Sequence, residues 1–210
     1  MNKSYAKWLP LTGILFVAMA IVGFIVGGEP PDAASNSADE IVQFYTDNGD
    51  RVMASIIILS IATVLFVFFG SYLRSVLDRG DGEDGMFSRI AFVGAVVFAV
   101  GGAIDGTLLI AISEAAGEVE PAQIETLQAF WDNDFLPLAL GIILFTLGSG
   151  ISIVLHKSLP VWLGWIAIVL GIVGVTPIGW IAFMGTGVWI LIVSVMLLMS
   201  ERKVATPVVQ

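Results

Sequence analysis

Residues Val52 to Tyr72 read VMASIIILSIATVLFVFFGSY, a stretch without any charged side chain that lies between Arg51 and Arg74. Because a helix needs roughly 20 mainly apolar residues to cross a bilayer, this stretch predicts a transmembrane helix. The whole chain is 57% hydrophobic and 13% charged, whereas soluble globular proteins carry about 25% charged residues. We therefore expect one membrane domain over residues 1–210.

Five further apolar runs lie on either side of this stretch. With it, they predict six transmembrane helices, at about 8–27, 52–72, 90–112, 135–155, 160–175 and 180–199. The last two are separated only by Thr176 to Gly179, where Pro177 and Gly179 favour a tight turn. The expected fold class is an all-α membrane protein, a bundle of six transmembrane helices.

The charged residues alternate between the gaps. Eight of the nine basic residues fall at the two ends and after the second and fourth runs, namely Lys3, Lys7, Arg74, Arg79, Arg89, Lys157, Arg202 and Lys203. The other gaps hold Arg51 and twelve of the eighteen acidic residues. Because cytoplasmic loops retain Lys and Arg, we expect a multi-pass membrane protein with both termini in the cytoplasm (N-in/C-in).

Two gaps on the expected outer side predict short amphipathic helices. Ser37 and Glu40 fit a capping box, and the apolar spacing that follows predicts a helix at about 39–46. Pro121 suits the first position of a helix, which predicts a second one at about 121–131. We expect both to lie at the outer membrane interface or across the mouth of the bundle.

The same two segments resemble each other. Residues 43–48 read QFYTDN and residues 128–133 read QAFWDN, and each leads into a run that would cross inward. They predict a parallel internal repeat of surface helix, span, inner loop and span, a kind known among transporters. The alternative is chance similarity between two interfacial sequences.

Glycines recur at intervals of seven residues in three of the expected spans. In lipid, small residues allow helices to approach closely, so we expect packing seams at Gly94, Gly101, Gly102, Gly106, Gly141, Gly148, Gly164 and Gly171. The alternative is that one of these stripes is a seam between copies of the chain.

Asp105 is the one acidic residue inside an expected span, and no Lys or Arg lies inside any span to neutralise it. An ionised carboxylate at about 10 Å below the outer boundary is costly, so Asp105 should face protein or water rather than lipid. It is the candidate site for a ligand or a proton, with Thr107 nearby and Ser149 of the fourth span as a helper. The alternative is a packing residue held by hydrogen bonds.

Several kinds of chemistry are disfavoured. The chain has no Cys and one His, His156, which removes disulfides, thiolate chemistry and metal sites with several His ligands. HExxH and GxSxG motifs are absent, so we expect no enzyme, no catalytic residue and no cofactor or metal. The net charge of −9 argues against a nucleic-acid partner.

The stretch from Leu159 to Phe183, LPVWLGWIAIVLGIVGVTPIGWIAF, and the segment from Glu40 to Arg51, EIVQFYTDNGDR, carry a resemblance. In these stretches the chain resembles a group of uncharacterised bacterial six-span integral membrane proteins. The resemblance implies a setting in the bacterial inner membrane, and it assigns no catalytic or binding residue.

The expected function is a non-enzymatic one in the lipid bilayer. It is either an accessory or interaction subunit for a membrane protein partner, or a binder of a lipid or small apolar ligand. The alternative is a small transporter or channel that uses Asp105 for cation or proton coupling. A water-filled cavity that reaches Asp105 would favour transport, whereas a dry, glycine-sealed bundle with only an outer groove would favour the accessory or lipid-binding role.

Overall fold

The computed structural model describes residues 8–79 and 85–204, with side chains up to residue 200. These residues form seven helices and no strand: α1 (Leu11–Gly27), α2 (Ala38–Leu77), α3 (Met86–Ala115), α4 (Pro121–Trp131), α5 (Leu136–His156), α6 (Val161–Gly174) and α7 (Gly179–Val204). The all-α class is therefore confirmed for the described part of the chain. Of the charges that define the expected inner side, Lys3, Lys7, Asp81, Glu83 and Asp84 and the side chains of Glu201, Arg202 and Lys203 lie outside it.

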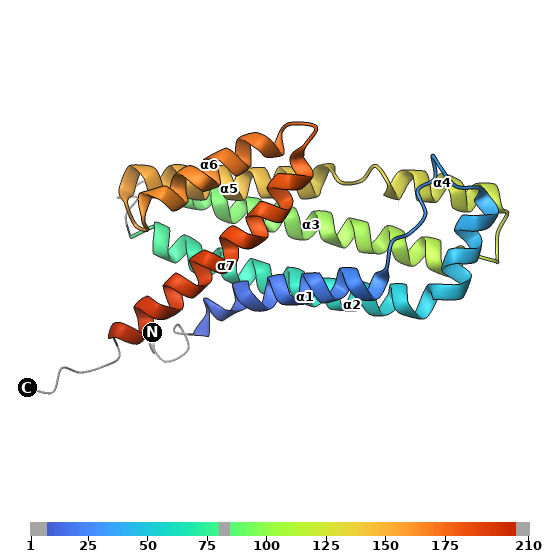
Figure 1. Ribbon diagram of the computed structural model, residues 1–210, viewed down its shortest axis with the longest axis horizontal. Helices are drawn as coiled ribbons and strands as arrows, with labels where there is room; N and C mark the ends of the chain where they lie inside the picture. The colour runs from blue at the N-terminus through green and yellow to red at the C-terminus, as the bar shows by residue number, and fades with distance from the viewer. Residues whose placement is uncertain (1–7, 80–84, 205–210) are drawn as a thin grey trace, which may run out of the picture.

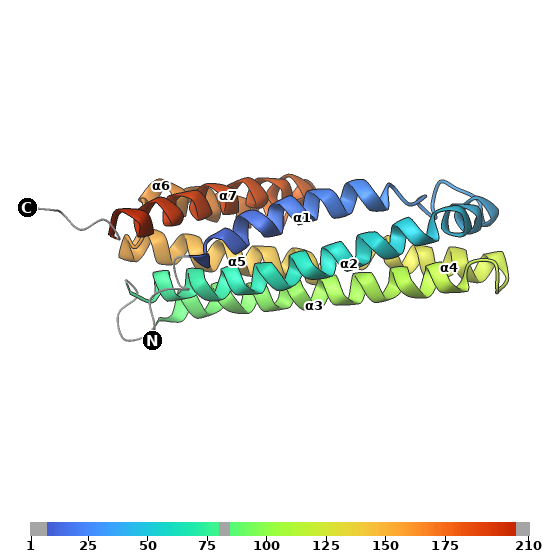
Figure 2. The same ribbon diagram turned by 90° about the horizontal axis from the view of Figure 1, so that it is seen from below.

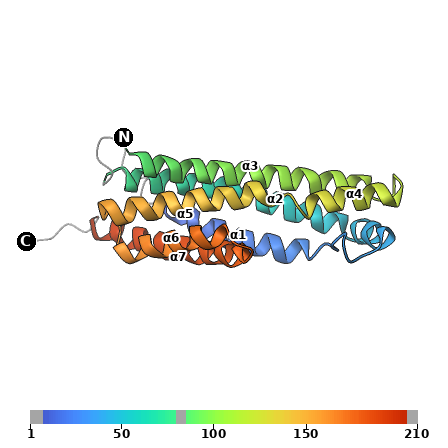
Figure 3. The ribbon, with the colours of Figure 1, turned by 90° about the horizontal axis from the view of Figure 1, so that it is seen from above.

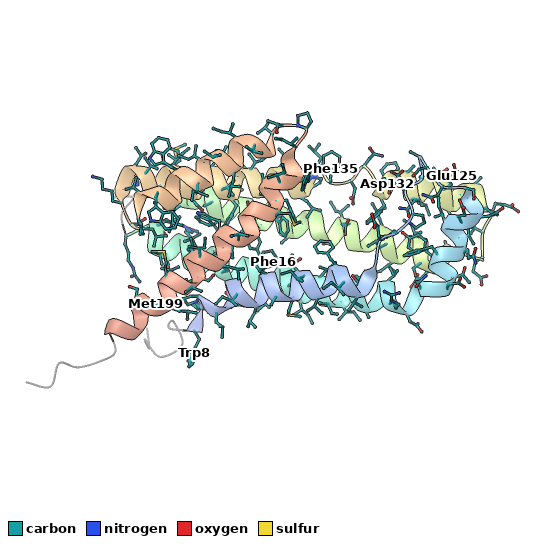
Figure 4. All side chains as sticks on the ribbon, viewed as in Figure 1. Trp8, Phe16, Glu125, Asp132, Phe135 and Met199 are labelled. Carbon is teal, nitrogen blue, oxygen red and sulfur yellow. The ribbon has the colours of Figure 1, made fainter. Side chains whose placement is uncertain are left out.

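The long helices lie side by side in an elongated bundle (Figures 1 and 2). α1, α3 and α6 run in one direction along it, and α2, α5 and α7 run in the other. α1 begins and α7 ends at the same end, and α4 lies at the opposite end (Figure 3). The two ends carry different side chains: the acidic residues Glu125 and Asp132 lie at the α4 end, and Trp8 and Met199 lie at the other end (Figure 4).

Four helical segments are long and apolar enough to cross a membrane. They are α2, α3, the segment Pro121–His156, which contains α4 and α5, and Gly179–Ser200 of α7. The apolar helices α1 and α6 have 17 and 14 residues. At 1.5 Å per residue α6 is about 21 Å long, which is shorter than the hydrocarbon core of about 30 Å. Each of the six expected spans thus lies largely within a helix, but the helices of two of these spans, α1 and α6, are short.

α2 begins where the sequence predicts a surface helix and then continues without a break. Its N-terminus has the complete capping box, since Ser37 accepts from the Glu40 backbone N–H and the Glu40 carboxylate accepts from the Ser37 backbone N–H. The helix runs on to Leu77, so a separate short helix at 39–46 was wrong. Asn48 and Gly49 lie within this helix, where Asn48 donates to the Phe44 carbonyl at 2.9 Å and a Cβ added to Gly49 would lie 3.4 Å from the Ser113 hydroxyl oxygen. Figure 1 shows α2 bending near this end.

α3 and α5 pack along a seam of glycines. A Cβ atom added to any of these glycines would collide with the backbone of the facing helix, because it would meet the backbone nitrogen of Phe145 at Gly94, of Leu138 at Gly101 (2.8 Å), of Phe98 at Gly141 and of Ala91 at Gly148 (2.6 Å). Since the obstructing atoms belong to the backbone, they cannot move aside as a flexible side chain can. Only glycine allows the two helices to lie this close.

The remaining predicted packing glycines fall into two groups. An added Cβ would lie 2.8 Å from a Val154 methyl at Gly164 and 2.5 Å from Leu147 Cγ at Gly171, so these two pack tightly between α5 and α6. At Gly102 and Gly106 the nearest atoms, on Thr63 and Ile56, are 3.4 Å away. This GxxxG pair therefore faces α2 across a looser contact than the α3–α5 seam.

The buried side chains form two separate cores. The larger one lies along the bundle and contains a group of aromatic rings in contact, Phe16, Phe66, Phe98, Phe145 and Trp189. Trp189 is 1% exposed and its indole donates to the Leu163 carbonyl at 2.9 Å, so it fills packing space between α6 and α7. The smaller core joins α2, α3 and α4 at the α4 end, around Ile41, Tyr45, Val52, Ile56, Leu109, Ile112 and Ile124.

Candidate ligand site

A chain of hydrogen bonds fastens α4 to the rest of the α4 end. The Tyr45 hydroxyl donates to Gln128 Oε1 at 2.7 Å, and Gln128 Nε2 donates to Asp132 Oδ1 at 2.9 Å. Asp132 Oδ2 accepts from the Ala33 backbone N–H at 2.9 Å. Tyr45 and Gln128 are both fully buried. This network holds α2, α4 and the segment before α2 together, and Asp132 has a structural role in it.

The α3–α5 seam also determines what lies opposite Asp105. Along the seam, Gly94 faces Phe145 and Gly101 faces Leu138, so a step forward in α3 corresponds to an equal step back in α5. Asp105 is four residues after Gly101, and Asp134 is four residues before Leu138. The two carboxyl groups are accordingly close enough to interact electrostatically. Asp134 belongs to the turn between α4 and α5 rather than to a helix.

Two polar atoms beside Asp105 lack hydrogen-bond partners. Oδ2 of Asp134 is buried and unpaired, and burial raises the pKa of this carboxyl group above its usual value. The indole Nε1 of Trp131 is within reach of the Asp105 carboxyl group, yet it forms no hydrogen bond of normal geometry. Buried polar atoms in native proteins are nearly always paired, and an unpaired one calls for an explanation. The unpaired oxygen of Asp134 can thus accept from a bound molecule, and the Trp131 N–H lies beside the Asp105 carboxyl group.

Asp105 lines a cavity of about 180 Å³. The cavity lies between α1, α2, α3 and α7, with Trp131 of α4 in its wall, and most of its lining is apolar: Phe24, Val52, Ile56, Leu59, Phe98, Leu109, Leu138 and Phe183. Gly102 and Gly106 leave room on the α3 side. Among the residues that line the cavity, Asp105 is the one with a charged side chain.

Three hydroxyl groups lie in the same wall, those of Ser55, Ser60 and Thr63, and two of them donate to helix carbonyls. Ser55 donates to the Gly23 carbonyl and Thr63 to the Leu59 carbonyl, each at 2.8 Å. These bonds use the hydroxyl hydrogens of Ser55 and Thr63, so the two groups can only accept from a ligand. Asp105 supplies the negative charge that would recognise a cationic group in the cavity.

Phe98 separates the cavity from the interior of the bundle. Its ring contacts Phe66 and Phe16, with centroids 5.1 and 6.2 Å away, and also Phe183 at 6.1 Å. Phe66 in turn stacks edge-on against Phe145 at 4.9 Å. These rings form a layer across the bundle on the side of the cavity that faces away from α4.

The structure does not bring Thr107 or Ser149 to Asp105. Thr107 is exposed on another face of α3, where its hydroxyl donates to the Ala103 carbonyl at 2.7 Å. Ser149 is fully buried, with an unpaired hydroxyl, but it follows Gly148, which faces Ala91. Ala91 precedes Asp105 by 14 residues in α3, or about 21 Å along a helix.

The residues that do meet Asp105, Trp131 and Asp134, were not part of the predicted site. The sequence contains one signal for them, because Asp105 continues the three- and four-residue spacing of Ala91, Gly94, Phe98 and Gly101. That spacing places Asp105 on the glycine seam, and hence against the start of α5. Among the described residues, no group of three or more His, Asp or Glu side chains is arranged to hold a metal ion.

Comparisons with known proteins add no relative. The chain matches no protein-family model, no curated protein and no solved structure. The resemblance to bacterial six-span proteins stays a prediction from the sequence.

Proposed function

We propose that this chain is a six-span protein of the bacterial cytoplasmic membrane that binds a small, mainly apolar molecule carrying one positive charge. The observation that carries the proposal is the cavity of about 180 Å³ whose apolar wall contains the Asp105 carboxylate. An apolar cavity of about 150 Å³ holds a molecule the size of benzene. A ligand with one aromatic or short aliphatic group and one ammonium group fits this size and chemistry.

The carboxyl groups of Asp105 and Asp134 support a cationic ligand. A carboxylate away from bulk water needs an opposite charge or hydrogen-bond donors, and the charged group that interacts with Asp105 is a second carboxyl group, on Asp134. An ammonium group between them would compensate both. The Trp131 ring in the cavity wall adds an aromatic surface, which attracts cations by about 0.5–2 kcal/mol.

The proposed topology has the α4 end outside. The basic residues Arg74, Arg79, Arg89 and Lys157 lie at the end where α1 begins and α7 ends, which supports both termini inside. If α5 begins at the outer border, Asp105 lies level with that border, because it faces Asp134, two residues before α5. The cavity would then be reached from the outer face rather than from mid-membrane.

An adjoining apolar groove offers a route from the membrane. It has a volume of about 720 Å³ and lies between the start of α5 and the α6–α7 turn. Leu138 and Phe183 line both this groove and the cavity. A molecule dissolved in the outer leaflet can therefore approach Asp105 along apolar surface.

Binding is tested with two probes of similar shape, benzylamine and benzyl alcohol, by thermal unfolding of the purified protein in detergent. We expect the amine to raise the unfolding midpoint more than the alcohol does. Asp105→Asn should remove this difference, and Gly102→Leu, which fills the cavity, should remove both shifts. Thr107→Val alters an exposed hydroxyl on another face of α3 and is the matched control. An amine shift that survives in Gly102→Leu would place binding elsewhere and refute the proposal.

A transporter coupled through Asp105 is the second candidate, and the observation in its favour is that the cavity reaches this carboxylate. The aromatic layer around Phe98 and Phe66 argues for binding without passage. Within the same non-enzymatic proposal, an accessory or interaction subunit for a membrane protein partner is the alternative to a ligand binder.

The internal repeat also stays a proposal. Its aligned positions have different surroundings, since Gln43 is exposed while Gln128 is buried, and Tyr45 is 1% exposed while Phe130 is 69% exposed. A repeat retained only in the path of the backbone is compatible with this difference. A repeat that preserves the roles of these side chains is not.

A further inference from the structure

A third hollow, of about 720 Å³, lies at the opposite end of the bundle from Asp105. It is formed where α2 ends, where α5 passes into α6, and where α7 nears its end. Its polar side consists of Arg79, His156, Lys157 and Ser158. Among the described residues, neither Arg79 nor Lys157 forms an ion pair, since the salt bridge there joins Arg74 to Asp78. We call this hollow the basic groove, because Arg79 and Lys157 give it positive charge.

Two further features favour an anion at this place. The Ser158 hydroxyl oxygen is buried without a hydrogen-bond partner. α6 begins beside it, after Pro160, and this N-terminus has no side-chain cap. The N-terminal N–H groups and the helix dipole favour a negative group. A phosphate oxygen in the groove would satisfy the hydroxyl and the helix end together.

Lys157 has an unusual backbone conformation. It ends α5 with φ 56° and ψ 29°, and it is the one described residue other than glycine with positive φ. Helices commonly end with glycine in this left-handed conformation, because a side chain makes it less favourable. A lysine here gives up some backbone stability and places a positive charge at the groove.

The other side of the groove is apolar. It is lined by Val76, Leu159, Met196 and Leu197. Nearby on the outer surface, Leu155 and Trp162 are 58% and 49% exposed, as expected for side chains that face lipid. A free phosphate ion has no use for an apolar wall, whereas a phospholipid places its headgroup on the basic side and its acyl chain on the apolar one. Basic pockets at the cytoplasmic border bind anionic headgroups in this way.

We infer that this groove binds the headgroup of an anionic phospholipid of the inner leaflet, with Arg79, Lys157 and the Ser158 hydroxyl contacting the phosphate. The site is independent of the cavity at Asp105. Lys157→Gly provides a discriminating variant, because glycine suits the backbone of this position while the charge is lost. Stability without lipid and affinity for lipid should then change in opposite directions.

The test measures the unfolding midpoint of the purified protein with phosphatidylglycerol, with phosphatidylcholine of the same acyl chains, and with inorganic phosphate alone. Of these three additions, we expect only phosphatidylglycerol to raise the unfolding midpoint of the wild type. Lys157→Gly should unfold at an equal or higher temperature without lipid, yet bind phosphatidylglycerol about fivefold more weakly, the effect of removing one charge near the headgroup. Arg79→Gln should weaken binding similarly, and Arg51→Gln, at the other end, should not.

Three results would overturn the inference. Equal stabilisation by phosphatidylcholine would show that headgroup charge is not recognised. Equal stabilisation by inorganic phosphate would assign the groove to a free anion. Undiminished binding of phosphatidylglycerol by both Lys157→Gly and Arg79→Gln would place the lipid elsewhere on the protein.

Discussion

The Tyr45 hydroxyl and Gln128 Oε1, 83 residues apart in the chain, form a 2.7 Å hydrogen bond in the interior of the α4 end. Neither residue has more than 1% of its surface exposed. Gln128 also holds Asp132, which in turn accepts from the backbone of Ala33. One buried amide thus links three segments that carry part of the cavity wall, including Trp131.

Tyr45→Phe should destabilise the protein by about 1–3 kcal/mol, because it leaves the Gln128 carbonyl oxygen buried without a donor. Gln128→Leu should have a comparable effect. Gln43→Leu is the matched control, since Gln43 is exposed at the aligned position of the proposed repeat. Thermal or denaturant unfolding in detergent measures all three. Equal effects of Gln43→Leu and Gln128→Leu would contradict this account of the network.

Glycine substitutions distinguish the tight seam from the looser face of α3. Gly94→Ala should lower the unfolding midpoint by the equivalent of about 1–3 kcal/mol, as expected for overpacking, because its Cβ collides with the Phe145 backbone. Gly102→Ala should be neutral or stabilising, since its nearest neighbour is 3.4 Å away and alanine is favoured over glycine in a helix by about 1 kcal/mol. If both variants fold equally well, α3 and α5 do not touch as described.

Replacing the carboxyl group by an amide should change the unfolding midpoint in opposite directions at Asp134 and Asp132. Burial raises the pKa of the Asp134 carboxyl group above its usual value of 3.8, so its ionisation opposes folding at neutral pH. This penalty is lost as the pH falls through the raised pKa towards 3.8. Asp134→Asn should therefore raise the midpoint at pH 7, and the gain should vanish on acidification.

Asp132→Asn should instead lower the midpoint, because both carboxylate oxygens accept hydrogen bonds and an amide replaces one of them with a donor. Unfolding curves of both variants between about pH 4 and 7 decide the matter. A destabilised Asp134→Asn at neutral pH would mean that this carboxylate already has a partner.

Some of this arrangement follows directly from the sequence. The apolar runs predict the helices, and Ser37 with Glu40 correctly predicts where α2 begins. The continuation of α2 beyond Thr46 was not predicted. Asp47, Asn48, Gly49 and Asp50 are residue types common in turns, yet all four lie within the helix.

The partners of Asp105 were missed for a related reason. Periodicity places Asp105 in line with Gly94 and Gly101, but it does not say which helix faces that line. Once α5 is known to face it, the antiparallel register brings Asp134 opposite. The similarity of QFYTDN and QAFWDN predicts similar surroundings for Gln43 and Gln128. The hydrogen-bond partner of the Gln128 side chain is however Tyr45, a residue of another helix, which the similarity does not reveal.

The proposed topology is directly testable because the chain has no Cys. Gln123→Cys places a thiol on an exposed position of α4, and Gln210→Cys places one at the C-terminus. A membrane-impermeant maleimide should label the first in intact cells and the second only after the membrane is opened. Labelling of Gln210→Cys in intact cells would contradict the assignment of the basic end to the cytoplasm.

Asp105→Asn separates binding from transport. The variant keeps the shape of the side chain and removes its charge, so it should fold normally and lose its preference for benzylamine over benzyl alcohol. In proteoliposomes loaded with a pH-sensitive dye, we expect the wild type to move neither protons nor amine, because the rings of Phe98 and Phe66 close the inner side of the cavity. Phe98→Ala is the informative companion, since it opens this layer without touching Asp105. Flux through the wild type that disappears in Asp105→Asn would establish the transporter instead, whereas flux that appears only in Phe98→Ala would identify the aromatic layer as the barrier that keeps this cavity a binding site.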